Sequence, residues 1–302
     1  MNTSVLKKFW QQCLHSNGSS AEPDEWNEQV SCIYQCGKGL EETLRYIYNQ
    51  RPSFEVFMQW ITPANEVATA GILTEDVLTA GDINFFEKNG FVVLSNAITI
   101  QQAEDAKNAI LKYLNADLND PASWYKNHEE KRGLMLMFYH HPALEVVRNS
   151  PRVRKAYEQL YAYTHIHKVV DKVSFNPPET SSFTFIGSPL HWDVSLVAPI
   201  PFVLQGLLYL NDVAADGGAF NCVPGFHNLL EDWLTNLPPG VNPREEAIRT
   251  LKPVPVTGEA GDFIIWHQGL PHCATANHGN MPRFVQYHTY LPNNLVQQKI
   301  WK

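Results

Sequence analysis

Apolar residues recur at helical spacing through the first part of the chain, and residues 24–61 are expected to be mainly helical. The clearest case is GLEETLRYIYNQ (39–50), which is bounded by Gly39 and Pro52. A second helix is expected in SFEVFMQWI (53–61). The apolar positions of the first helix are Leu40, Leu44, Ile47 and Tyr48.

The helical pattern continues through EVATAGILTEDVLTAGDINFFEKNG (66–90) and stops at Gly90, a residue type common at helix C-termini. FVVLSNAI (91–98) is rich in β-branched residues and predicts a short strand. TIQQAEDAKNAILKYLNA (99–116) predicts an amphipathic helix with Thr99 as its N-cap. The buried face of this helix is expected to contain Ala103, Ala106, Ile110 and Leu114.

From about residue 165 the pattern changes to short strands separated by Gly and Pro. Such strands are typical of a β-sandwich or jelly roll, and the chain shows no internal repeat. The sequence therefore predicts a mainly β protein with helical additions, an α+β fold. The expected strand segments are HKVVDKVSFN (167–176), LHWDVSLV (190–197), PFVLQGLLYLND (201–212), GGAFNCVPG (217–225), KPVPVTGEAGDFIIWHQ (252–268) and RFVQYHTYLP (283–292).

The charge and the apolar runs limit the partners of the chain, which has 302 residues and a formal net charge of −8. Nucleic acid and anionic membranes would repel such a chain on average, so neither is expected as a partner. MNTSVLKKFWQQCLHSNG (1–18) lacks the continuous apolar core of a signal peptide. The longest apolar run, 197–210, is interrupted by two prolines and Gln205, and it is too short to cross a bilayer.

The five cysteines are odd in number and irregularly spaced. Cys32 and Cys36 lie close together in the chain, but no second pair follows that would complete a metal site. The expectation is therefore a set of reduced thiols in a cytoplasmic protein.

The candidate chemistry begins at His191 and Asp193, which flank Trp192 in an otherwise apolar segment. On an extended strand, His191 and Asp193 point to one face and Trp192 points to the other. A carboxylate buried beside an imidazole is costly unless a positive charge compensates it. A bound divalent metal would supply that charge, with a further ligand from a distant strand.

Candidates for this further ligand are His267, His272 and His278, all within residues 261–284. Two histidines and one carboxylate are the ligand set of non-haem Fe(II) oxygenases and leave three positions open for co-substrate and dioxygen. A catalytic zinc could use similar ligands, although the spacing is not the helical His-Glu-x-x-His type. Arg283 follows His272 by eleven residues, and its forked guanidinium suits a carboxylate ligand.

The segments LHWD, QGLLYLNDVAADGGAFNCVPGFH, GDFIIWHQGLPHCATAN and RF together resemble the phytanoyl-CoA dioxygenase family of Fe(II)/2-oxoglutarate-dependent oxygenases. The resemblance covers residues 82–292 and implies a double-stranded β-helix core, a jelly roll of the cupin-like type. It implies His191, Asp193 and His272 as metal ligands. It also implies that Arg283 binds the distal carboxylate of 2-oxoglutarate, and the spacing to this arginine selects His272 over His267.

Other positions are weaker candidates. Family members often carry a small hydroxyl residue two places after the distal histidine. Here that place is Ala274, and the neighbouring Thr275 is the candidate contact to 2-oxoglutarate. Gln205 and Tyr209 share one strand face and are candidates for the same role, or are core residues bonded to the backbone. The candidate substrate contacts are Trp124, Met135, Phe220 and His227.

The expected reaction is hydroxylation of a C–H bond in a small molecule, using Fe(II), 2-oxoglutarate and dioxygen and releasing succinate and carbon dioxide. No catalytic residues are expected beyond the metal ligands. Two alternatives are a cupin-like metal- or metabolite-binding protein without turnover and a protein-directed hydroxylase. A third is a metal-free sandwich in which the candidate ligands form an ion-pair network. Residues 1–75 are expected to form a helical extension, and residues 76–302 the oxygenase domain.

Overall fold

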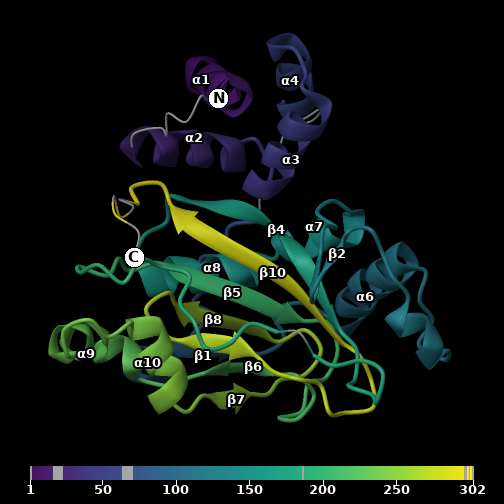
Figure 1. Ribbon diagram of the computed structural model, residues 1–302, viewed down its shortest axis with the longest axis vertical. Helices are drawn as coiled ribbons and strands as arrows, with labels where there is room; N and C mark the ends of the chain where they lie inside the picture. The colour runs from purple at the N-terminus through teal and green to yellow at the C-terminus, as the bar shows by residue number, and fades with distance from the viewer. Residues whose placement is uncertain are drawn as a thin grey trace.

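The computed structural model describes residues 2–15, 23–62, 71–185, 187–295, 298 and 300, and it consists of two β-sheets, a layer of helices and a separate group of N-terminal helices (Figure 1). The helices are α1 (Thr3–His15), α2 (Pro23–Gln35), α3 (Leu40–Gln50), α4 (Phe54–Ile61), α5 (Ala80–Asn89), α6 (Ile100–Leu114), α7 (Pro142–Arg148), α8 (Pro151–Tyr161), α9 (Leu230–Asn236) and α10 (Pro243–Thr250), with 3-10 turns η1 (Pro121–Tyr125) and η2 (Phe226–Asn228). The strands are β1 (Phe91–Leu94), β2 (Lys131–Arg132), β3 (Met135–Leu136), β4 (Ile166–Asn176), β5 (Leu204–Tyr209), β6 (Phe220–Cys222), β7 (Val254–Val256), β8 (Phe263–His267), β9 (His272–Ala274) and β10 (Arg283–Pro292).

The larger sheet has the strand order β1-β8-β5-β10-β4-β3-β2, and the smaller sheet has the order β7-β6-β9. All the strand pairs are antiparallel. Because residues alternate between the two faces of a strand, the larger sheet presents one face to the helices and the other to the smaller sheet. The predicted jelly-roll core with added helices is confirmed.

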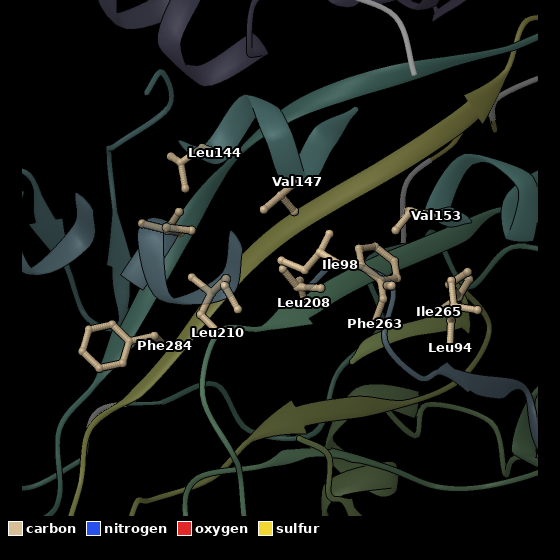
Figure 2. Packing of buried hydrophobic residues seen from close by; sticks show 14 of the residues in the cluster. Leu94, Ile98, Leu144, Val147, Val153, Leu208, Leu210, Phe263, Ile265 and Phe284 are labelled. Carbon is tan, nitrogen blue, oxygen red and sulfur yellow. The ribbon is translucent and has the colours of Figure 1, made fainter. Parts of the chain in front are cut away.

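The helix-covered face of the larger sheet forms the main hydrophobic core. Leu208, Phe263 and Phe284 of the strands belong to one buried cluster with Leu144 and Val147 of α7 (Figure 2). The fully buried Val173 and Leu204 belong to the same cluster. Packing of this face fixes which residues point the other way, because each neighbour in the strand must lie on the opposite side.

The opposite face of the larger sheet packs on the smaller sheet. Its buried cluster includes Leu207, Ile264 and Val285 from the larger sheet and Phe220 and Cys222 from β6. Register pairs Val285 with Tyr209, and Tyr287 with Leu207, so these four side chains lie on this inner face. The candidate site lies on this face as well.

The N-terminal helices have a core of their own. Leu6 and Phe9 of α1 pack with Ile33 of α2, Ile47 of α3 and Phe57 of α4, and all five are fully buried. In Figure 1 this group lies beside one end of β4 and β10. Among the helices of the described ranges, none has both the length and the apolarity that a bilayer-spanning segment needs.

Several local predictions are confirmed. Thr99 caps α6 by accepting a hydrogen bond from the Gln102 amide, and Gly90 ends α5 with a left-handed backbone at φ 80°. The predicted buried face of α6 is buried in the structure. All five cysteines are free.

Two predicted elements differ from the structure. Residues 71–79 are not helical, so the continuous helix expected over 66–90 is reduced to α5, and residues 66–70 lie outside the described part of the chain. The expected strand 190–197 is also wrong. It is an irregular segment that pairs with β9 only at His191, because Trp192 and Val194 are drawn into a separate cluster beside α9 and α10.

Candidate metal centre and its cavity

A backbone pairing brings two distant histidines together. The amide of His191 donates to the carbonyl of His272 at 2.9 Å, and the amide of His272 donates back to the carbonyl of His191 at 3.0 Å. Residues paired in this way across an antiparallel bridge carry their side chains on the same face. The two imidazole rings consequently lie 4.5 Å apart between centroids.

Asp193 completes the cluster. Its Oδ1 lies 3.6 Å from Nε2 of His191, and its Oδ2 lies 3.3 Å from Nε2 of His272. One ligand atom from each of the three residues lies within 4.8 Å of the others. Residues 81 positions apart in the chain thus form one compact donor set, as the sequence predicted for His191, Asp193 and His272.

The other nitrogen of each imidazole is held by the backbone. Nδ1 of His191 lies 2.8 Å from the carbonyl of Pro189, and Nδ1 of His272 lies 3.1 Å from the carbonyl of Leu270. A carbonyl can only accept, so each Nδ1 carries a proton, and Nε2 is the nitrogen whose lone pair is available to a metal. This arrangement orients a histidine for metal binding through Nε2.

The electrostatics of the cluster favour a cation. Burial, together with the neighbouring His272, lowers the pKa of His191 and keeps that ring neutral near pH 7. Burial opposes ionisation of Asp193, but the neighbouring His272 and the hydrogen bond donated by Gln205 outweigh it and lower the pKa of this carboxyl. Two Nε2 lone pairs and an ionised carboxylate therefore converge, which fits a divalent metal such as Fe(II).

The segment that carries Asp193 is held from both sides. Arg244 of α10 donates to the carbonyls of Trp192 at 2.9 Å and Val194 at 3.0 Å, the residues on either side of Asp193. Trp192 points away from the cluster, as predicted, and donates its indole N–H to the carbonyl of Gly269 at 2.9 Å. Because this segment is not a strand, it lacks the main-chain hydrogen bonds of a sheet. The bonds made by the side chains of Arg244 and Trp192 hold the segment, and with it the Asp193 carboxylate, in place.

A cavity of about 410 Å³ adjoins the cluster. Its wall combines the three donors with inner-face residues of the larger sheet and with the β2–β3 hairpin. The wall residues that concern the site are Arg132, Met135, Asp171, His191, Asp193, Gln205, Leu207, Phe220, Trp266, His272, Arg283, Tyr287 and Thr289.

Arg283 is the buried cation of this cavity, with 2% of its surface exposed. Nη1 donates to the carbonyl of Gly218, and Nη2 donates to Oγ of Ser174 at 3.3 Å. Within the described ranges no acidic group pairs with Arg283, and its buried Nε has no partner. A buried guanidinium left in this state fits an anionic ligand that enters the cavity.

Three of the weaker candidates also lie on the cavity wall. Gln205 donates from Nε2 to Oδ2 of Asp193 at 2.8 Å, while its buried Oε1 has no partner in the described structure. The side chain of Gln205 therefore supports a metal ligand directly. Met135 and Phe220 also line the cavity.

The remaining four candidates lie elsewhere. The hydroxyl of Tyr209 donates to the carbonyl of Val256 and accepts from the amide of Phe220, so Tyr209 is a core residue, as the weighed alternative had it. The hydroxyl of Thr275 contacts Asn221 and the carbonyl of Ala219, outside the cavity wall.

Trp124 and His227 are also away from the cavity. Trp124 is buried in the main core and donates to the carbonyl of Asp117. His227 lines a different cavity, which it shares with His267.

Sequence reasoning missed Ser174 and Arg244. Ser174 faces Arg283 because strand pairing places β4 beside β10, and Arg244 reaches the metal segment from a helix about fifty residues later. Neither residue lies in a motif that could have pointed to it.

Replacing Gln205 with leucine is expected to weaken metal binding about 10- to 100-fold, because Asp193 loses the hydrogen bond that orients it. Titration of the metal-free protein with Fe(II) under nitrogen measures this change. Tyr209→Phe, on the same strand but outside the cavity, serves as the control and should retain wild-type affinity. An unchanged affinity in Gln205→Leu would show that the Gln205 bond has no part in the metal site.

Comparison with known proteins agrees with this geometry. The family model described as "Phytanoyl-CoA dioxygenase (PhyH)" matches residues 86–285. A Dictyostelium discoideum protein described as "Putative phytanoyl-CoA dioxygenase" is 20% identical over 265 residues, covering 70% of this chain and 75% of that protein.

Two solved structures are similar in fold. The epimerase SnoN, solved in complex with Fe3+, alpha ketoglutarate and nogalamycin RO, is 16% identical with a TM-score of 0.51, covering 70% of this chain and 82% of SnoN. HygX from Streptomyces hygroscopicus, solved with nickel and 2-oxoglutarate bound, is 16% identical with a TM-score of 0.53, covering 73% of this chain and 89% of HygX.

A jelly-roll core with a two-histidine, one-carboxylate cluster beside a buried arginine defines the non-haem iron- and 2-oxoglutarate-dependent oxygenases. The family match covers most of the chain. The protein belongs to the phytanoyl-CoA dioxygenase family, and its predicted assignment as a dioxygenase is confirmed.

Proposed function

We propose that His191, Asp193 and His272 bind Fe(II), that Arg283 binds the distal carboxylate of 2-oxoglutarate, and that the chain hydroxylates a C–H bond of a small molecule. The observation that carries this proposal is the convergence on one cavity of three donors and a buried arginine that has no acidic partner among the described residues. When bound, the iron and 2-oxoglutarate supply oxidation by dioxygen, coupled to release of succinate and carbon dioxide.

The side chains of this chain have three tasks. The two Nε2 atoms and the Asp193 carboxylate, which line the cavity, would hold the metal there. The guanidinium of Arg283, with the hydroxyl of Ser174 beside it, orients the co-substrate. Leu207, Phe220 and Trp266 provide apolar wall beside the metal and limit access of water.

Hydroxylation rather than halogenation is proposed because the carboxylate position is filled by Asp193, whereas halogenases that resemble this family vacate it for chloride. A small-molecule substrate fits a cavity of about 410 Å³. A cytoplasmic location is proposed from the five free cysteines, which suit a reducing compartment.

We also propose that residues 1–75 form an accessory helical unit and residues 76–302 the oxygenase domain. The separate core of α1–α4 and the start of the family match at residue 86 support this division.

Succinate production tests the proposed function. Purified protein with Fe(II) and 2-oxoglutarate should form succinate in air and none under nitrogen, and adding a cell extract that contains the substrate should increase the rate. Fe(II) and 2-oxoglutarate that bind in calorimetry without succinate forming in air, with or without extract, would instead identify a binding protein without turnover.

A further inference from the structure

Strand β4 contains one extra residue at a point that faces the catalytic cavity. Gln286 pairs with Val173 and His288 pairs with Val170, so two residues of β4, Asp171 and Lys172, lie opposite the single residue Tyr287. A bulge of this kind redirects side chains and is common next to active sites.

The faces of the neighbouring residues show where the bulge directs Asp171. Val173 belongs to the helix-covered core, and the ring of His288 contacts Phe263 in the same core. The bulge between these two pairs therefore opens to the inner face, where Tyr287 lies. Both Asp171 and Tyr287 line the catalytic cavity.

Asp171 lies away from the place assigned to 2-oxoglutarate. Arg283 and Tyr287 are on the same face of β10 and four residues apart, which is about 13 Å along a strand. Arg132, the other cation of the cavity wall, is in register with Met135 and Ser174, the serine that contacts Arg283. The cavity is therefore cationic towards Arg283 and anionic at Asp171.

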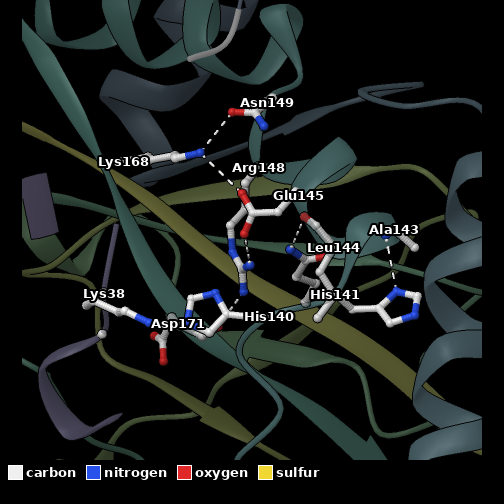
Figure 3. Close-up of polar contacts among 12 residues, drawn as sticks. Lys38, His140, His141, Ala143, Leu144, Glu145, Arg148, Asn149, Lys168 and Asp171 are labelled. Carbon is white, nitrogen blue, oxygen red and sulfur yellow. Dashed lines mark hydrogen bonds and ion pairs between the residues drawn. The ribbon is translucent and has the colours of Figure 1, made fainter. Parts of the chain in front are cut away.

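The two cations whose charges lower the pKa of Asp171, Lys172 and Arg148, are bonded to other groups. Lys172 forms an ion pair with Glu41 of α3. Arg148 donates to Glu145 and to the main-chain carbonyl of Asp171, and Figure 3 shows Glu145 between Arg148 and Lys168.

The carboxylate of Asp171 itself accepts from the amide of Lys172 at 2.7 Å, and within the described ranges it belongs to no ion pair. Burial raises the pKa of this carboxyl although the nearby Lys172 and Arg148 act to lower it, because a charge at a buried position is costly. A ligand cation at this place would remove that cost.

We infer that the substrate carries a primary ammonium group and that Asp171 binds this group, with the ring of Tyr287 beside it. Residues directly opposite each other on neighbouring strands have Cβ atoms about 5 Å apart, so a cation at Asp171 also meets the aromatic ring. The inference rests on the proposed function, because it assumes that the cavity binds a substrate. Repulsion from Arg132 and Arg283 sets the orientation, with the ammonium group directed to Asp171.

Three probes with one carbon skeleton test the inference: hexylammonium, 1-hexanol and hexanoate. Each is titrated into Fe(II)-loaded protein under nitrogen, with and without 2-oxoglutarate, and binding is followed by ligand-observed NMR. Hexylammonium should bind at least about tenfold more tightly than 1-hexanol, which corresponds to about 1.4 kcal/mol, and hexanoate should bind most weakly. In Asp171→Asn the ratio between the amine and the alcohol should fall to about one.

Asp232→Asn is the control, because it removes one negative charge from an exposed residue of α9 that lies outside the wall of the catalytic cavity. It should keep the wild-type ratio. Equal binding of amine and alcohol to the wild type overturns the inference, as does a ratio that survives in Asp171→Asn or falls equally in Asp232→Asn. Asp171→Glu keeps the negative charge and should retain a preference for the amine. Comparing it with Asp171→Asn distinguishes loss of the charge from misfolding.

The outcome is separable from that of the proposed function. A wild-type protein that binds 2-oxoglutarate but shows no preference for the amine contradicts only the substrate class. A wild-type protein that prefers the amine but binds no 2-oxoglutarate supports the ammonium site and contradicts the oxygenase assignment of the cavity.

Discussion

Changing Asp193 to alanine is expected to abolish succinate formation and to weaken Fe(II) binding by more than about 100-fold. Removing a residue that only orients a ligand costs about 10- to 100-fold in affinity, so removing the ligand itself should cost more. The variant also brings two neutral imidazoles together without the carboxylate that attracts the cation. Fe(II) titration under nitrogen and succinate measured in air give the two quantities.

The control for this change is Asp232→Ala, which removes an exposed carboxylate on α9 that lines a different cavity. It should leave metal affinity and succinate formation at wild-type values. Wild-type-like turnover in Asp193→Ala would refute the ligand assignment. A loss of metal binding that is equal in both variants would point to general charge effects instead of a specific ligand.

The local parts of the fold could be predicted because short stretches of sequence encode them. Thr99 and Gly90 act at helix ends through bonds to residues within four positions. The series of short predicted strands after residue 165, separated by Gly and Pro, likewise indicates a jelly roll. The segment 190–197 was mispredicted because its alternation of apolar residues reflects packing of Trp192 and Val194 on α9 and α10 and not a sheet ladder.

The site residues could be predicted only where their spacing along the sequence matches that of a known family. His191, Asp193, His272 and Arg283 follow the order and intervals of a known family, so the donors and the buried arginine could be named in advance. The support of those groups depends on pairing between distant segments. The alternation of side chains along β5 correctly predicts that Tyr209 faces the inside of the jelly roll. Its hydroxyl nevertheless bonds to the backbone of β6 and β7. The cavity wall includes Leu207 and Gln205 of this strand but not Tyr209.

Asp171 illustrates the same limit. Regular alternation from Val173 would turn Lys172 inward and Asp171 outward, and only the bulge opposite Tyr287 brings Asp171 to the cavity. A bulge depends on the register of two strands more than a hundred residues apart. The charge of the substrate site was therefore not readable from the sequence.

Changing Arg283 to glutamine is expected to raise the 2-oxoglutarate concentration needed for half-maximal turnover at least about 30-fold. Truncating one partner of a buried charged pair costs about 2–5 kcal/mol, and each 1.4 kcal/mol is a factor of ten. Ser174→Ala is the control, since it removes one hydrogen bond that the same guanidinium donates to a hydroxyl at 3.3 Å but keeps the guanidinium, and it should cost less than Arg283→Gln.

A co-substrate analogue makes the test of Arg283 specific. 2-Oxobutyrate keeps the keto acid but has no distal carboxylate, so the wild type should bind it far more weakly than 2-oxoglutarate. In Arg283→Gln the two keto acids should bind about equally, because the group that distinguishes them is gone. If the variant still prefers 2-oxoglutarate as strongly as the wild type does, another cation holds the distal carboxylate, and Arg132 is the remaining cationic residue of the cavity wall.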